Sequence, residues 1–178
     1  MAQALEFWFD DDADRAVREL WSKLERAGVP SLATRTHGRH RPHVTFAIAG
    51  AIPAATREAL RADLGKLAVP RLWLSTLAAF SAVDNALILA AVVDTELLAV
   101  HSAVHDVLAG RVRQPSAYYL PGSWVPHCTL AQGLETGRIA AGFAALYPVE
   151  PIRATVAEIA VVDTHTGVAE QLFRLSGM

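Results

Sequence analysis

Residues 42–47 read Pro-His-Val-Thr-Phe-Ala, and residues 126–131 read Pro-His-Cys-Thr-Leu-Ala. Proline, histidine, threonine and alanine are identical in the two hexapeptides, and the other two positions hold apolar residues in both. Each hexapeptide supplies one imidazole and one hydroxyl, which are groups that can transfer protons and bind a phosphate near neutral pH. The repeat therefore predicts a site that is built from two similar halves.

The spacing within each hexapeptide predicts a β-strand with one polar and one apolar face. Residues i and i+2 of a strand share a face, so His43 and Thr45 would project together, as would His127 and Thr129. The residues between them would point into a core. The alanine that ends each hexapeptide would come next on the polar face, where its small side chain would leave room for a ligand.

The elements around the first hexapeptide recur around the second. The first half predicts strands at 5–9, 43–49 and 72–79, with helices that follow Asp10 and begin at Pro53. The second half predicts strands at 86–93, 127–131 and 153–162, helices at 95–109 and 136–146, and a final strand at 169–175. A short strand is also expected near Leu32. This order predicts a single domain, 1–178, made of two related lobes at about 1–80 and 86–178, with a pseudo-two-fold axis that brings the hexapeptides into one cleft.

Composition limits the class of protein. The chain has 178 residues, is 52% hydrophobic and carries a net charge of −2, which is typical of a globular domain and not of a general nucleic-acid-binding surface. Its longest apolar run, 86–93, is too short to span a membrane, and no secretory signal is visible at the N-terminus. The single cysteine, Cys128, indicates a reducing compartment, so a cytoplasmic protein is expected.

Two long loops, about 29–41 and 111–125, precede the hexapeptides, and both carry basic residues. Arg41 is the first candidate to neutralise an anionic substrate. Tyr119 and Trp124 lie in the second loop, where they could stack on a base or pin the loop to the body of the protein; the sequence favours neither interpretation.

Two His-x-Thr motifs spaced 84 positions apart in a duplicated α/β chain resemble those of the two-histidine (2H) phosphoesterase superfamily. The chain looks most similar to its bacterial group called 2′-5′ RNA ligase or RNA 2′,3′-cyclic phosphodiesterase. The resemblance implies an α+β fold of two lobes, each a mainly antiparallel sheet with outer helices. It also implies catalysis by His43 and His127, phosphate binding by Thr45 and Thr129, no cofactor or metal, and a monomer that acts on an RNA 3′ end or a small cyclic nucleotide.

Hydrolysis of a cyclic phosphodiester needs a base to activate water and an acid to protonate the leaving oxygen, and histidine can do either. His127 is the suggested base and His43 the acid, although the symmetry allows the reverse. The threonines would stabilise charge on the phosphate oxygens. Reversal of the reaction would give 2′-5′ RNA ligase activity. The alternatives are a non-catalytic module that binds RNA ends or a nucleotide, and a 2H enzyme for ADP-ribose cyclic phosphate or 2′-5′ oligonucleotides.

Other histidines suggest a metal site. His101 and His105 are four residues apart on a predicted helix, but Ser102 stands where a zincin motif has glutamate, and no third ligand is evident. His37, His40 and His43 recur at every third residue. We predict no metal site from either pattern.

Overall fold

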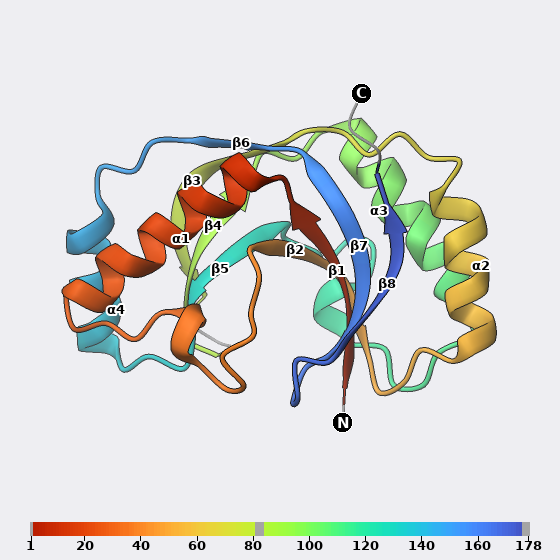
Figure 1. Cartoon of the computed structure of the whole chain (residues 1–178), viewed down its shortest axis with the longest axis horizontal. Coiled ribbons are helices and arrows are strands. Elements are labelled where there is room, and N and C mark those ends of the chain that lie inside the picture. Colours follow the sequence, from red (N-terminus) through yellow and green to blue (C-terminus); the bar gives the residue numbers. More distant parts are fainter. Residues whose placement is uncertain (1, 81–83, 176–178) are drawn as a thin grey trace.

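Two four-stranded antiparallel sheets form the body of the protein (Figure 1). The computed structural model describes residues 2–80 and 84–175. The first sheet has the order β2 (His43–Ala49), β1 (Gln3–Phe9), β7 (Val156–Asp163) and β8 (Ala169–Arg174). The second has the order β5 (His127–Ala131), β4 (Ala86–Ala91), β3 (Leu72–Phe80) and β6 (Ile152–Ala154). The predicted α+β class, with two antiparallel sheets and helices, is confirmed.

Each sheet takes strands from both halves of the chain. β3 leaves the first half to pair with β4, and β7 leaves the second half to pair with β1. The sequence segments 1–80 and 86–178 therefore do not each form a separate sheet. The exchange is reciprocal, because β3 of the first half and both β7 and β8 of the second half cross to the other sheet. The two hexapeptide strands, β2 and β5, each lie at an edge of their sheet.

The helices pack in two pairs at opposite ends of the molecule (Figure 1). One pair is α1 (Asp11–Arg26) with α4 (Thr136–Leu146), and the other is α2 (Ala54–Leu64) with α3 (Thr95–Leu108). Asp10 and Asp94 cap α1 and α3 by accepting hydrogen bonds from backbone N–H groups of the first turn, as expected for helix starts. No helix among residues 2–80 and 84–175 is long and apolar enough to cross a membrane.

Three local predictions are wrong. The residues near Leu32 form a 3₁₀ helix, Leu32–Thr34, that the Ser31 side chain caps. Pro53 lies just outside α2 as its N-cap residue. The strand predicted at 153–162 is two strands, because Thr155 leaves the ladder and its backbone bonds to Asp10 instead, with its N–H donating to Oδ2 at 2.6 Å and its carbonyl accepting from the Asp10 N–H at 2.8 Å.

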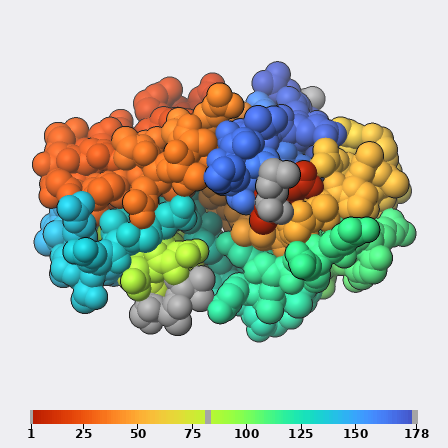
Figure 2. Space-filling model, turned by 90° about the horizontal axis from the view of Figure 1, so that it is seen from below, coloured from red at the N-terminus to blue at the C-terminus, as the bar shows by residue number. Residues whose placement is uncertain are grey.

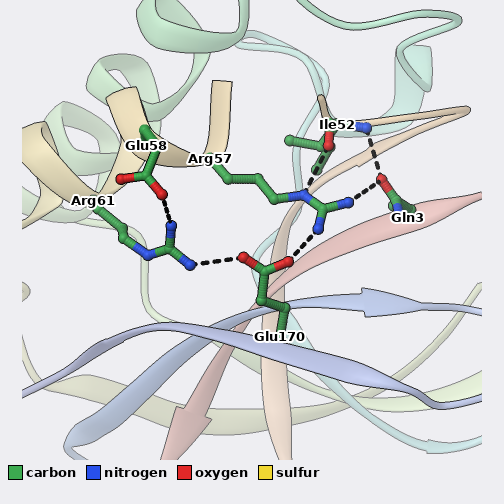
Figure 3. A network of polar contacts seen from close by, with 6 residues as sticks. All are labelled: Gln3, Ile52, Arg57, Glu58, Arg61 and Glu170. Carbon is green, nitrogen blue, oxygen red and sulfur yellow. Dashed lines mark hydrogen bonds and ion pairs between the residues drawn. The ribbon is translucent and has the colours of Figure 1, made fainter. Parts of the chain in front are cut away.

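A polar network ties the first strand to the C-terminal hairpin (Figure 3). The Arg57 guanidinium on α2 donates to the Ile52 carbonyl at 2.8 Å and to Gln3 Oε1 at 3.3 Å, and it pairs with the Glu170 carboxylate on β8. Arg61, one turn along the same helix, bonds to the other Glu170 oxygen at 2.7 Å. The network therefore links α2 to both β1 and β8.

Candidate active site

The two predicted histidines are the first residues of β2 and β5, which lie side by side where the two sheets meet (Figure 1). Val44 and Phe46, and Cys128 and Leu130, are fully buried in the core, so the predicted inward face of each strand is confirmed. Burial raises the pKa of the Cys128 thiol to about 12, which keeps the thiol protonated and inert near pH 7.

A β-bulge follows the threonine in both hexapeptide strands. Thr45 pairs with Glu6 and Ala47 with Leu5, so Phe46 has no partner, and Leu130 is skipped in the same way between Thr129 and Ala131. A bulge turns the next residue away from the face that it would otherwise occupy. Ala47 and Ala131 therefore belong to the buried core, and the prediction that they leave room for a ligand beside the threonines is wrong.

Both histidine rings are oriented by the carbonyl group two residues earlier. His43 Nδ1 lies 2.6 Å from the Arg41 oxygen, and His127 Nδ1 lies 2.7 Å from the Val125 oxygen. A carbonyl oxygen only accepts hydrogen bonds, so each Nδ1 carries hydrogen, and in the neutral ring Nε2 holds the lone pair. The intervening prolines restrict the backbone that presents each carbonyl. Each hexapeptide thus supplies one imidazole whose Nε2 can accept or donate a proton.

The indole N–H groups of two tryptophans donate hydrogen bonds to backbone carbonyls at the outer edges of the two hexapeptide strands. Trp124 Nε1 donates to the Thr45 carbonyl at 3.0 Å, and Trp21 Nε1 donates to the Thr129 carbonyl at 3.3 Å. The same backbone position is therefore capped by an indole in each half. These bonds hold the edge strands where no neighbouring strand could do so.

The surroundings of the two histidines differ. His127 meets the edge of the Phe80 ring, with ring centroids 4.8 Å apart. Burial, together with the charge of His43, lowers the pKa of His127, so its ring is neutral near pH 7. The Nε2 of His43 instead lies 3.6 Å from Glu6 Oε1, which is an ion-pair distance and longer than a hydrogen bond.

One threonine and one histidine of the two hexapeptides, Thr129 and His127, border a cavity. Within the described part of the chain, neither the Thr45 nor the Thr129 hydroxyl has a hydrogen-bond partner, so both remain available as donors. A cavity of about 450 Å³ lies beside the second hexapeptide. Its lining includes Phe80, Asp84, Ser116, Tyr118, Tyr119, Trp124, His127, Thr129 and Gln132. His43 and Thr45 are more buried and are not part of this lining. The surface view shows a hollow between the segment that begins at residue 84 and the loop of residues 111–125 (Figure 2).

A family model described as the 2′-5′ RNA ligase superfamily matches residues 9–168. The chain belongs to this superfamily. The matched segment includes both hexapeptides and all four helices. No curated protein sequence matches the chain. The recognition of a 2H phosphoesterase from the paired His-x-Thr motifs is therefore confirmed at the level of the family.

Two solved structures of Usb1 from Kluyveromyces marxianus share the fold. The first has a TM-score of 0.51, and the second, of Usb1 with uridine monophosphate, has a TM-score of 0.53. Each is 11% identical to this superfamily member, and the alignment covers 98% of both chains. At that identity the likeness shows a common fold.

Tyr119, Trp124 and Arg41, the three loop residues predicted to bind substrate, lie in different surroundings in this 2′-5′ RNA ligase superfamily member. Tyr119 lines the cavity, and burial with the carboxylates of Asp84 and Glu6 raises the pKa of its hydroxyl to about 12. Trp124 also borders the cavity, but its N–H is committed to Thr45 and its ring stacks on His101 with centroids 3.9 Å apart. Arg41 lies over the Trp8 ring, 4.1 Å from its centroid, and pairs with Glu158 at 3.3 Å.

The two histidines of α3, His101 and His105, each lie within hydrogen-bonding distance of a backbone carbonyl. His101 Nε2 lies 2.9 Å from the Tyr119 carbonyl and His105 Nε2 lies 3.0 Å from the Phe46 carbonyl, so each ring holds a segment next to the site in place. Residues 2–80 and 84–175 contain no cluster of three or more histidine, cysteine or acidic side chains that could hold a metal ion.

Sequence reasoning missed Glu6, Trp8 and Phe80. All three belong to strands that the sequence analysis predicted. The feature that could have indicated a site residue is Glu6, which is the one charged residue in the apolar run Leu5–Phe9. A carboxylate in a buried strand is costly unless it has a partner, so its position indicates a specific interaction. The partner lies 37 residues away on β2 and becomes visible only in the folded structure.

Proposed function

We propose that this chain is a phosphoesterase that opens a 2′,3′-cyclic phosphate on an RNA end or a nucleotide by two-histidine acid–base catalysis. The observation that carries the proposal is the matched pair of imidazoles on adjacent strands that also present two threonine hydroxyls. Each ring has Nδ1 held by a carbonyl, and within the described part of the chain neither Nε2 makes a hydrogen bond. Two bases placed in this way suit displacement at phosphorus, where one group removes a proton as another supplies one.

In the proposed reaction, neutral His127 removes a proton from water as the water oxygen attacks phosphorus. Protonated His43 donates its Nε2 proton to the ribose oxygen as the bond between that oxygen and phosphorus breaks. The products are a phosphomonoester and a free ribose hydroxyl. The lowered pKa of His127 favours its role as base. The Glu6 carboxylate lies 3.6 Å from His43 Nε2, where it can pair with the imidazolium that an acid requires.

Thr45 and Thr129 would donate hydrogen bonds to the non-bridging phosphate oxygens, where negative charge must be stabilised in the transition state. The nucleoside would occupy the 450 Å³ cavity, which is within the usual size range for small-molecule sites and carries aromatic rings that can stack on a base. The Usb1 structure with uridine monophosphate supports a nucleotide ligand for this fold. Tyr119 and Trp124 would contact the ligand, and Arg41 would contribute positive charge.

Ligation would be the same chemistry with an RNA 5′-hydroxyl in place of water. Attack by that oxygen on the cyclic phosphate, with cleavage of the bond to O3′, yields a 2′-5′ linkage, and O3′ takes the proton from His43. The name of the superfamily supports testing for this activity alongside hydrolysis.

The test is turnover of 2′,3′-cyclic nucleotides and cyclic-phosphate-ended RNA in excess chelator. The wild-type protein is expected to form a phosphomonoester, and His43→Ala and His127→Ala should each lower kcat by about 10²- to 10⁴-fold. His165→Ala, at an exposed turn, is the matched control and should retain activity. Tight nucleotide binding without turnover would instead establish a binding module, and full activity in either histidine variant would refute the mechanism.

A further inference from the structure

The strands next to the two hexapeptides break the symmetry of the site. On β1, Trp8 pairs with His43 and Glu6 with Thr45. On β4, the equivalent positions are Ala90, which pairs with His127, and Ile88, which pairs with Thr129. Paired residues on adjacent strands point to the same face of the sheet, so one hexapeptide has a carboxylate and an indole beside it and the other has two aliphatic side chains.

The Glu6 carboxylate is held in place by its neighbour on the same face. Trp8 Nε1 donates to Glu6 Oε2 at 2.7 Å, which leaves Oε1 directed toward His43 Nε2 at 3.6 Å. Only 8% of Glu6 is exposed to solvent, so its charge is weakly screened. Trp8 is fixed in turn by the Arg41 guanidinium over its ring.

We infer that Glu6 is a positioning residue that pairs through Oε1 with the imidazolium of His43 and thereby makes His43, and not His127, the acid of the proposed reaction. The inference rests on the proposed function. A negative charge beside Nε2 favours the imidazolium form, and an imidazolium is what an acid must be before the reaction begins. Phe80, Ile88 and Ala90, which contact or pair with His127, carry no charge. Asp84 lines the same cavity, but within the described part of the chain no carboxylate forms an ion pair with His127.

Other titratable groups near His43 do not supply this charge. His40 is neutral near pH 7, since burial and the charges of His37 and His43 lower its pKa to about 4. Among residues 2–80 and 84–175, the other groups that face this part of the sheet are Arg41 on the loop before β2, His127 on β5, Tyr119 in the second loop, Glu158 on β7 and Arg174 on β8. Glu158 is already paired with both arginines. Glu6 is therefore the carboxylate that acts directly on His43.

The experiment is the pH profile of kcat/KM for Glu6→Gln. Glutamine keeps an oxygen that can accept the Trp8 bond but removes the charge. We expect little change at pH 6 and about a tenfold loss at pH 8, because the alkaline limb, which reports loss of the acid's proton, moves to lower pH. The acidic limb, set by His127, should stay in place. Glu6→Asp retains the charge and should restore the alkaline limb even if the rate is lower.

Glu170→Gln removes the same charge from the exposed end of the α2–β8 network and should leave the profile unchanged. Histidine NMR titrations of the ligand-free protein separate this inference from the proposed function, since His43 should titrate at lower pH in Glu6→Gln whether or not a substrate has been found. An unchanged His43 titration in a folded Glu6→Gln protein would overturn the inference, and absence of turnover in the wild type would overturn only the function.

Discussion

At the scale of single residues, the site depends on a few hydrogen bonds that set which atom of each side chain is free. The carbonyls of Arg41 and Val125 fix the histidine rings, and the threonine hydroxyls are left without partners among residues 2–80 and 84–175. A hydroxyl that already has a strong partner would lose that bond on binding phosphate, whereas a free one gains it. The residue-scale geometry thus favours an anion between the two strands.

Replacement of Thr129 tests this role. Valine has nearly the shape of threonine but lacks the hydroxyl, so Thr129→Val should lower kcat by about 10²-fold, which is the usual cost of removing one transition-state donor. Thr129→Ser keeps the hydroxyl and should stay within a few-fold of the wild type. Steady-state kinetics with a cyclic nucleotide is the measurement, and equal activity of the valine and serine variants would contradict phosphate binding by this residue.

At the scale of elements, β2 and β5 are edge strands that side chains from other elements hold at their unpaired side. Trp21 comes from α1, His105 from α3 and Trp124 from the loop before β5. Each donates to, or lies within hydrogen-bonding distance of, a hexapeptide carbonyl. The helices and loops therefore determine where the two histidines lie relative to each other.

Removal of the indole N–H of Trp21 or Trp124 should destabilise the hexapeptide strand whose carbonyl it binds, and therefore the fold. Trp124→Phe and Trp21→Phe leave the Thr45 and Thr129 carbonyls without their donors and also reduce core volume, so each should lower the free energy of unfolding by about 1–3 kcal/mol. Trp73→Phe, at a residue that is 39% exposed, is the control. Chemical denaturation measures the effect. If the two buried variants lost no more stability than the control, the edge-capping role would be disproved.

At the scale of the whole molecule, several buried histidines make folding depend on pH. Burial, with the charge of His105, lowers the pKa of His101 to about 4, and burial also lowers the pKa of His105 and His127. The unfolded chain binds these protons near pH 6.5, whereas the folded state binds them only at lower pH. The resulting stability is fully present above pH 6.5 and is lost as the pH falls toward 4.

The variant His101→Gln measures how much His101 alone contributes to the pH dependence of stability. The amide can still donate to the Tyr119 carbonyl but does not titrate, so the fall in unfolding free energy between pH 7 and pH 4 should be smaller than in the wild type by on the order of 2 kcal/mol. His165→Gln, in the exposed turn before β8, should keep the wild-type pH dependence. Denaturant titrations at a series of pH values measure the unfolding free energy of each protein. If that free energy fell equally with pH in the wild type and in His101→Gln, His101 would not be a source of the pH dependence.

The elements and the main candidate residues follow from local sequence. The period-two pattern of each hexapeptide predicts the strands, Asp10 and Asp94 predict the helix starts, and the repetition itself predicts two related halves. These are properties of neighbouring residues, whose side-chain directions and backbone hydrogen bonds depend on spacing along the chain.

Only the tertiary structure decided which strands share a sheet and which neighbours the histidines acquire. The exchange of β3 and β7, the pairing of Glu6 with the first hexapeptide, and the bonds from Trp21 and Trp124 join residues up to 160 positions apart, as for Gln3 and Asp163. Such contacts depend on how whole elements pack, and packing is set by the combined burial of many side chains and not by any one motif. The sequence by itself therefore determined a symmetric pair of imidazoles and hydroxyls, and folding made that pair unequal by placing a buried carboxylate beside only one of the two rings.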